Sequence, residues 1–196
     1  MRRRVLVTGA NGLIGRRVVK LLQGDSEPIA VVRASTPKAC AVETITADLM
    51  DPNFAERLPS RADAVIHLAQ SAGYTSFPEN TNSMFAVNVA ALAKLLDWSA
   101  KVGVKTFLLA STGGLYGRGP RPFKETDPVR IDGPLSFYFS TKRASEIIAS
   151  PYRDLFDVTA LRYFFSATSA EPEIIPRRTW SWIVSKARYG LTALAP

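Results

Sequence analysis

The chain has 196 residues, 46% of them hydrophobic and 21% charged, with 12 Gly and 13 Pro; this composition suits one folded domain and excludes a disordered, collagen-like or low-complexity protein. The single cysteine, Cys40, and the single histidine, His67, exclude a disulfide scaffold and a metal site of the usual His and Cys kind. The formal net charge is +8, but no basic stretch is interleaved with aromatic residues, so we expect anionic small ligands rather than nucleic acid as partners.

The amino terminus carries no recognisable targeting signal. After three arginines the sequence passes into a short apolar run, 5–7, that is far too short for the core of a signal peptide. No stretch of about 18 apolar residues occurs that could span a bilayer. We therefore expect a cytoplasmic protein without a membrane partner.

Short apolar runs alternate with longer helical patterns along the chain, which is typical of a parallel sheet covered by helices on both faces. Strands are predicted at 4–8, 28–33, 42–46, 64–68, 104–110 and 158–164. Helices are predicted at 13–23, 53–58, 84–102 and 136–150. Between them, Gly113–Pro134 is rich in Gly and Pro and is predicted to be a lid or binding loop. The sequence thus predicts an α/β, doubly wound Rossmann domain over residues 1–170.

A glycine-rich turn, TGANGLIG at 8–15, directly follows the first predicted strand and opens the first helix. Gly9, Gly12 and Gly15 allow a tight turn, close approach of backbone amides to a pyrophosphate, and close packing of helix on strand. A purely structural turn is the alternative. Because the motif stands between a strand and a helix, as dinucleotide binding requires, we favour a dinucleotide site.

The residue after the second predicted strand is expected to decide which dinucleotide binds. An acidic residue there would bond the adenosine ribose of NAD and repel the extra phosphate of NADP. The sequence has Arg33 instead, which can bind that phosphate with two hydrogen bonds, with Arg16, Ser35 and Lys38 as further candidates. NADP is therefore preferred and NAD is the alternative, since Arg33 could also be a solvated residue at a strand end.

Tyr138 and Lys142 stand four residues apart on a predicted helix and so share one face. A neighbouring ammonium favours the phenolate form of a tyrosine, which could then act as a base near neutral pH. Alone, such a pair is more often a surface pair. Together with the glycine turn and with Thr112 at the end of the fifth predicted strand, the pair indicates a catalytic site.

Ordered motifs over residues 4–164 resemble the extended short-chain dehydrogenases/reductases, specifically the NAD-dependent epimerase/dehydratase family. The motifs are, in chain order, TGANGLIG (8–15), Asp48-Leu49, His67-Leu68-Ala69, Asn88, STGGLYG (111–117), ETDP (125–128), PLS (134–136), YFSTK (138–142) and LRYF (161–164). The resemblance implies that Tyr138 is the general acid or base and that Lys142 holds the nicotinamide ribose and lowers the pKa of the tyrosine. It also implies that Thr112 hydrogen-bonds the reacting oxygen.

Further residues are implied by the resemblance to lie at the cofactor. They are Gly9, Asn11, Gly12, Leu13, Ile14, Gly15, Arg33, Asp48, Leu49, Leu68, Ala69, Gln70, Asn88, Ser111, Tyr163 and Phe164, together with Tyr138 and Lys142. Asn88 is implied to be the helix asparagine behind the active site. Asp48 and Leu49 could instead form a plain loop and helix cap, and Asn88 could bond only to backbone. His67 is implied to pack at a strand end without a catalytic role.

The sequence departs from the family after Phe164. The family usually continues with Asn and a Tyr-Gly-Pro turn, whereas this chain has Phe165–Ser169. Ile174–Arg177 resembles the start of the family's C-terminal substrate lobe, and the chain stops at Pro196. We therefore expect the lobe to be largely absent, with residues 171–196 as its remnant or as a terminal helix.

Two functions are open on these grounds. The first is an NAD(P)-dependent oxidoreductase or epimerase that acts on a hydroxyl or carbonyl of a sugar or nucleotide sugar. Gly113 and Gly114 stand where a sugar dehydratase would need an Asp-Glu pair, which argues against that subgroup. The second is a non-catalytic module that binds NADP. By analogy with the family, the chain could form a homodimer through the helices that carry Asn88 and Tyr138.

Overall fold

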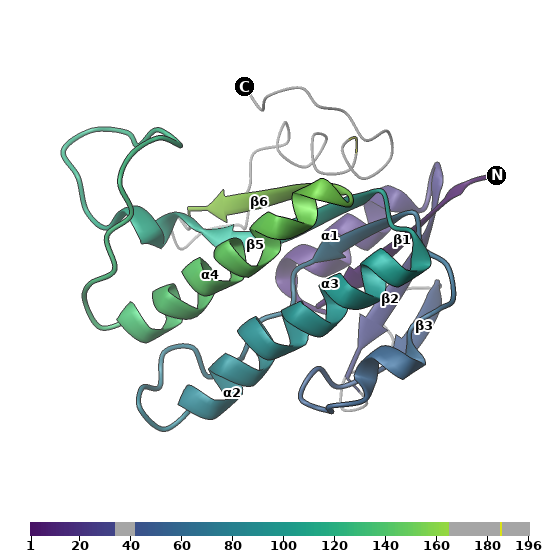
Figure 1. The fold of residues 1–196 in the computed structure, drawn as a ribbon, viewed down its shortest axis with the longest axis horizontal. Helices are drawn as coiled ribbons and strands as arrows, with labels where there is room; N and C mark the ends of the chain where they lie inside the picture. Colours follow the sequence, from purple (N-terminus) through teal and green to yellow (C-terminus); the bar gives the residue numbers. More distant parts are fainter. Residues whose placement is uncertain (34–41, 165–184, 186–196) are drawn as a thin grey trace.

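Six parallel strands form one sheet in the computed structural model, which describes residues 1–33, 42–164 and 185. The strands are β1 (Arg3–Thr8), β2 (Ser26–Val32), β3 (Glu43–Thr46), β4 (Ala64–His67), β5 (Thr106–Thr112) and β6 (Asp157–Tyr163). Their order is β3-β2-β1-β4-β5-β6 (Figure 1). The predicted doubly wound arrangement is confirmed. The expected remnant of a lobe at 171–196 lies outside the described residues, apart from Ser185, so the domain boundary near 170 stays a prediction.

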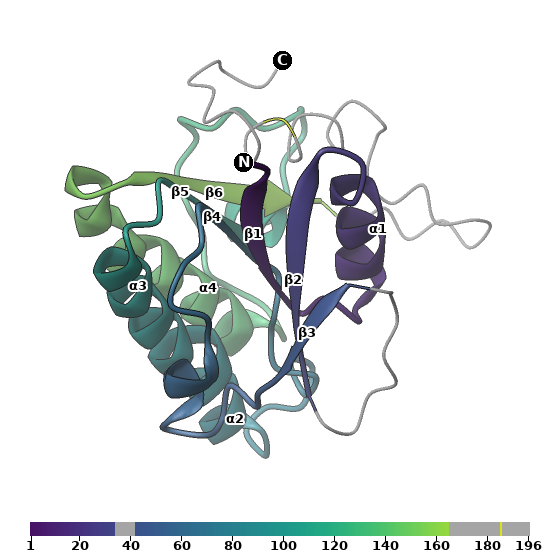
Figure 2. The same ribbon diagram turned by 90° about the vertical axis from the view of Figure 1, so that its right-hand side faces the viewer.

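Helices cover both faces of the sheet. They are α1 (Leu13–Leu22), α2 (Thr81–Phe85), α3 (Ala91–Val102) and α4 (Ser136–Ala149), with short 3₁₀ turns at Phe54–Arg57, Gly113–Tyr116 and Ser150–Asp154. Figure 2 shows α1 on one side of the sheet and α3 and α4 on the other. The predicted coverage of both faces is therefore confirmed for the described residues.

Alternating side chains of the central strand β1 supply two separate cores. Leu6 packs into the core shared with Leu95 of α3, whereas Val5 and Val7 pack into the core shared with Val18 of α1. Each buried Val or Leu contributes roughly 1.5–3 kcal/mol relative to exposure. Because both faces of the sheet are buried, β1 carries a continuous apolar run rather than an alternation of polar and apolar residues.

The helix predicted at 84–102 is longer and less regular than its periodicity indicated. It begins at Thr81 as α2, passes through a π-helical turn at Ala86–Ala90, and continues as α3. The π turn carries Asn88, which is 2% exposed and whose side chain bonds to groups on two other segments. Such turns often occur at functional sites, and a period of 3.6 residues gives no sign of them.

Strand β5 reaches two residues further than predicted. Ser111 and Thr112 pair with Arg162 and Tyr163 of β6, so both lie within the sheet rather than in the following loop. The predicted loop Gly113–Pro134 then starts with a 3₁₀ turn. The backbone that follows Thr112 is thus fixed by the sheet on one side and by a turn on the other.

The helix α1 approaches the turn that follows β1 so closely that only glycine fits at position 15. A Cβ on Gly15 would lie 2.1 Å from the Gly9 carbonyl oxygen and 2.7 Å from Ala10 Cα. Gly9 has a φ of +67°, in the left-handed region that favours glycine. The two glycines together set the direction in which α1 leaves the sheet.

Glu146 on α4 joins the helix to β5 and β6. Its Oε1 accepts hydrogen bonds from Ser111 Oγ at 2.6 Å and Arg162 Nε at 2.8 Å. Its Oε2 accepts from Arg162 at 2.7 Å and Arg143 at 2.9 Å, and Arg162 also donates to Tyr116 Oη at 2.6 Å. Burial alone would raise the pKa of Glu146, but the hydrogen bonds from Arg162, Ser111 and Arg143 lower it below its ordinary value.

We expect Gly15→Ala to lower the free energy of unfolding by about 1–3 kcal/mol, because the added methyl group forces α1 away from β1. The gain in helix propensity, about 1 kcal/mol at most, does not offset this. The measurement is urea denaturation. Gly24→Ala is the control, since its Cβ would meet nothing within 4 Å among the described residues, and the two variants being equally stable would contradict the packing argument.

We expect Glu146→Gln to lower the free energy of unfolding at neutral pH by about 1–3 kcal/mol, since Arg162 loses its charged acceptor. The folded-state pKa of Glu146 lies below the ordinary 4.5, so its contribution is complete above that pH and is lost as the pH falls through the lowered pKa. The difference between the two proteins should therefore narrow in acid. Asp97→Asn is the control: Asp97 pairs with Lys101 at side chains 58% and 73% exposed, so little change is expected.

Candidate functional site

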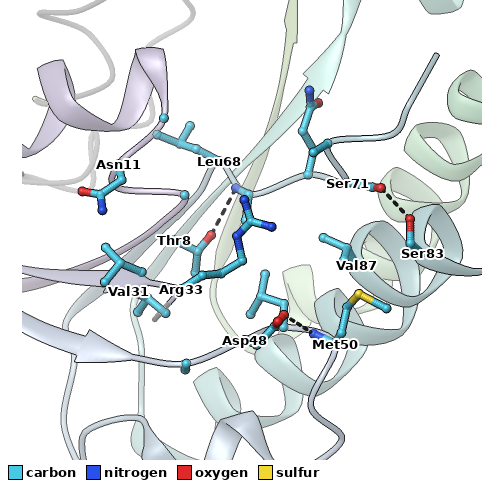
Figure 3. A pocket seen from close by; sticks show the side chains of 18 of the residues that line it. Thr8, Asn11, Val31, Arg33, Asp48, Met50, Leu68, Ser71, Ser83 and Val87 are labelled. Carbon is cyan, nitrogen blue, oxygen red and sulfur yellow. Dashed lines mark hydrogen bonds between the residues drawn. The ribbon is translucent and has the colours of Figure 1, made fainter. Parts of the chain in front are cut away.

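A cavity of about 460 Å³ opens at the carboxyl ends of β1, β2, β3 and β4. It lies where the order of the strands reverses, because β1 pairs with β2 on one side and with β4 on the other. In open parallel sheets, ligands bind in the crevice at such a point. Figure 3 shows the cavity bounded by the glycine turn, the ends of β2 and β4, the segment after β3, and residues of α2 and the π turn.

The glycine turn forms one wall of the cavity and brings bare backbone to it. Gly9, Asn11 and Gly12 line the cavity. A Cβ on Gly9 would lie 2.8 Å from the backbone nitrogen of Ala69, so the turn and the end of β4 touch through backbone alone. The first amides of α1 have no partner within the helix. This wall can therefore hold an anion with backbone N–H groups.

The second wall carries two charged side chains, Arg33 at the end of β2 and Asp48 after β3. Leu49, next to Asp48, also lines the cavity. Figure 3 shows the Arg33 side chain extending across the cavity, above the turn in which Asp48 Oδ1 accepts a hydrogen bond from Met50 N at 2.9 Å. The turn at Asp48 that the sequence left open as a plain loop is thus part of the cavity wall.

Tyr138 does not itself line the cavity but lies next to Gln70, which does. Its phenol donates a hydrogen bond to Gln70 Oε1 at 3.0 Å, and Thr112 lies near enough to act on the pKa of the phenol. Its ring packs against Tyr74 with the centroids 5.1 Å apart. The structure thus brings together Tyr138, Thr112 and Gln70, which come from α4, β5 and the end of β4.

The electrostatics around Tyr138 are dominated by burial. Burial and, to a smaller extent, Tyr74 raise the pKa of Tyr138 to about 12, although the bond to Thr112 lowers it. Lys142 is 3% exposed, and burial lowers its pKa to about 8 while Glu146 acts to raise it. Lys142 is not among the causes that set the tyrosine pKa, so its predicted lowering of that pKa is not seen in this structure.

His67 is a neutral packing residue beside this group. It is 2% exposed, and its Nδ1 shares a hydrogen bond of 2.7 Å with Thr8 Oγ1. Burial, with a smaller effect of Lys142, lowers its pKa to about 3. The same Thr8 oxygen accepts from Ala69 N at 3.3 Å. An uncharged imidazole that holds the end of β4 agrees with the structural role implied for it.

Several residues implied to bind the cofactor do not line the cavity. Asn88 lies behind it, where Oδ1 accepts from Ser71 N at 3.0 Å and Nδ2 donates to Thr141 at 2.9 Å. Ser111 points at Glu146, and Phe164, 56% exposed, stacks on Tyr116 instead. Leu13, Ile14, Gly15 and Tyr163 are also absent from the lining, and so are Thr112, Tyr138 and Lys142, of which Tyr138 meets the cavity through Gln70. The reasons differ: Asn88 and Ser111 bond to other elements, Tyr163 and Ile14 pack in the core beside α1, and Leu13 is 55% exposed.

Other residues line the cavity without having been predicted. Ser71, Gly73, Asn80, Ser83 and Val87 form its side nearest α2. Little in the sequence indicated that these residues line a site, because the helix was predicted to begin only at residue 84. A start at residue 81 would have placed Ser83 and Val87 four positions apart on one face.

The described residues contain neither a membrane-spanning helix nor a cluster of metal ligands. In that part of the chain no helix has both the length and the apolar character needed to cross a membrane. Across the same ranges, no three His, Cys, Asp or Glu side chains gather as metal ligands.

Known proteins resemble this chain in sequence and fold. A probable UDP-glucuronate 4-epimerase of Rhizobium meliloti (strain 1021) is 29% identical over 181 residues, covering 82% of this chain and 52% of that protein. The UDP-glucose 4-epimerase of Thermus thermophilus, solved with NAD, has a TM-score of 0.70 at 29% identity and covers 87% of this chain and 59% of its own. That of Thermotoga maritima, solved with UDP-glucose, has a TM-score of 0.71 at 30% identity and covers 82% and 55%.

The chain spans about half the length of the relatives that it matches. The model of the NAD-dependent epimerase/dehydratase family nevertheless matches residues 5–194, which is almost the whole chain. The strand order, the glycine turn and the helix with Tyr138 and Lys142 agree with that match. This chain therefore belongs to the NAD-dependent epimerase/dehydratase family of enzymes.

Proposed function

We propose that this chain is the cofactor-binding and proton-transferring part of an enzyme that acts on a hydroxyl or carbonyl group of a nucleotide sugar, as an epimerase or a simple oxidoreductase. The observation that carries the proposal is the junction between the cavity and Tyr138. Gln70 lines the cavity and bonds the Tyr138 phenol at 3.0 Å. A dinucleotide along the cavity would thus end beside a group that can exchange a proton.

The residues that line the cavity suit the adenosine and pyrophosphate of a nicotinamide adenine dinucleotide, with Gln70 toward the nicotinamide. The glycine turn, which lines the cavity, and the first amides of α1 would face the pyrophosphate. Arg33 and Asp48 would hold the adenosine side, and Gln70 would lie at the nicotinamide side. Asp48, Leu49, Leu68 and Ala69 line the cavity as that assignment requires.

The cofactor, when bound, supplies the hydride transfer, and the residues of this chain handle the proton. Tyr138 Oη would take a proton from the substrate hydroxyl or return it to the carbonyl. Thr112, whose hydroxyl acts to lower the pKa of the phenol, would hold the same substrate oxygen. Lys142, whose pKa is about 8, would hold the nicotinamide ribose. The positive charge that Lys142 carries below that pH would favour ionisation of the phenol.

The relatives favour a UDP-linked sugar as the substrate. Their names specify UDP-glucuronate in one case and UDP-glucose in others. We extend this substrate class to the present chain because its cavity and Tyr138 occupy the part of the fold that it shares with them. Epimerisation and simple oxidation both begin with the removal of a proton and a hydride from the sugar, so the same residues of this chain would serve either reaction.

We further propose that NADP is preferred over NAD. Arg33 stands in the cavity at the end of β2, where an acidic residue would favour NAD. A guanidinium there can bind a ribose phosphate with two charge-assisted hydrogen bonds. The relative from Thermus thermophilus was solved with NAD, so this preference would set the present chain apart from it.

A homodimer through α3 and α4 is proposed on the family resemblance. Phe85 of α2 and Ile147 of α4 expose 56% and 58% of their surface, which leaves apolar groups on the side of the molecule that such a dimer would cover. A cytoplasmic location is likewise proposed from the sequence.

We expect Tyr138→Phe to lower turnover of UDP-glucuronate or UDP-glucose at least about 100-fold, because the proton-transferring oxygen is lost. Cofactor affinity should change little, since the ring is kept. Product sugars are separated by chromatography, and cofactor binding is measured by fluorescence titration. Tyr152→Phe, whose ring packs on Phe156, is the control. Cofactor binding with no Tyr138-dependent turnover would instead support the non-catalytic module.

We expect Arg33→Ser to weaken NADPH binding by about 10- to 100-fold while leaving NADH binding within about threefold, since only NADPH carries the phosphate that Arg33 would bind. Isothermal titration of both cofactors measures the ratio. Arg153→Ser is the matched control, because Arg153 is exposed and lies in the turn before β6, at the opposite edge of the sheet. Equal losses for both cofactors would refute the preference for NADP.

A further inference from the structure

Gln70 stands where the cavity and the Tyr138 group meet. It lines the cavity, and its Oε1 accepts the hydrogen bond from the Tyr138 phenol at 3.0 Å. It follows β4 closely, at the edge where the strands end. Its side chain therefore links the proposed cofactor groove to the proposed proton-transferring group.

Hydrogen bonds hold the backbone in place on both sides of Gln70. Leu68 N donates to Thr8 O at 3.2 Å, and Ala69 N donates to Thr8 Oγ1 at 3.3 Å. On the other side, Ser71 N donates to Asn88 Oδ1 at 3.0 Å. Asn88 is itself bonded to Thr141 of α4 at 2.9 Å, three residues beyond Tyr138. The Gln70 backbone and the helix that carries Tyr138 are therefore held in a fixed relation.

We propose that Gln70 is a positioning residue that holds the Tyr138 phenol at the end of the cavity and that, by turning its side-chain amide, it serves both the phenol and the phenolate. The inference rests on the proposed function of Tyr138 as the proton-transferring group. It assigns to Gln70 a role distinct from simple contact with the cofactor.

An amide is suited to this role because it carries both an acceptor and donors. The neutral phenol donates to Oε1, as in the structure. After the proton has left, rotation about the last torsion of the side chain, which is soft in Gln, brings Nε2–H to the phenolate oxygen. The proton itself passes between Tyr138 Oη and the substrate oxygen, and Gln70 neither gains nor loses one. A carboxylate at this position could only accept, and it would oppose formation of the phenolate.

Other groups also face Tyr138, and their effects on the phenol must be distinguished from the effect of Gln70. Thr112 reaches the phenol from the end of β5, Tyr74 packs on it from the segment after β4, and Lys142 follows on the same helix. His67 on β4 is neutral at ordinary pH because its pKa is about 3. A change confined to Gln70 leaves all four of these in place, so its effect on Tyr138 can be assigned.

The test places difluorotyrosine at position 138 of the full chain, because fluorination lowers the pKa of the phenol enough to offset the rise caused by burial and makes the ionisation visible by fluorine NMR. Its pKa is measured with Gln70 unchanged and in Gln70→Glu and Gln70→Leu, in the absence of any sugar. Gln23→Glu is the matched control, since it makes the same chemical change at an exposed residue beyond α1. The kcat of each variant with unlabelled Tyr138 is measured on the sugar nucleotides named above.

We expect Gln70→Glu to raise the pKa of the label by about one unit or more, because a negative charge faces the phenolate, while Gln23→Glu leaves it unchanged. Gln70→Leu should shift the pKa of the label little, because leucine removes both the acceptor for the phenol and the donor for the phenolate. It should lower kcat about five- to tenfold, which corresponds to the free energy of one hydrogen bond. An unshifted label in Gln70→Glu, or an undiminished kcat in Gln70→Leu, would overturn the inference.

The two readouts separate this inference from the proposed function. The label reports the contact between Gln70 and Tyr138 whether or not the chain turns over a sugar nucleotide. A shifted label in a chain without turnover would therefore count against the proposed function, because the contact would exist without the chemistry.

Discussion

The site depends on the reversal of strand order at β1. Because all six strands are parallel, their carboxyl ends share one edge, and the connections after β1 and β4 leave toward opposite sides of the sheet. The backbone that follows these strands therefore diverges and leaves a crevice. Gly9 and Ala69 approach within backbone contact at its floor, and residues that are 60 positions apart in the chain become neighbours.

Burial of polar groups shapes the chemistry at one end of that crevice. Lys142 and His67 are 3% and 2% exposed, and removal from water lowers the pKa of both. The same removal raises the pKa of Tyr138 to about 12. Without a ligand, the tyrosine is therefore protonated at neutral pH. The hydrogen bond to Gln70 offsets part of the cost of burying the phenol.

The contact between Tyr138 and Gln70 requires that the helix α4 is held in a fixed position on the sheet. Glu146 binds it to β5 and β6 through Ser111 and Arg162, and Asn88 binds it to the segment after β4. Both anchors lie outside the cavity, yet they set where Tyr138 stands relative to Gln70. Residues that the family pattern suggests as ligands are in this structure part of the support behind the site.

The sequence alone determined the order of strands and helices, the glycine turn and the shared face of Tyr138 and Lys142, because each follows from local periodicity and residue geometry. It could not show that Asn88 and Ser111 turn away from the cavity, that Gln70 meets the phenol, or that burial outweighs Lys142 in setting the tyrosine pKa. Those features depend on sheet register, on a π turn without a periodic signature and on which groups lose water. Only the tertiary structure fixes them, since each arises between segments that are far apart in the chain.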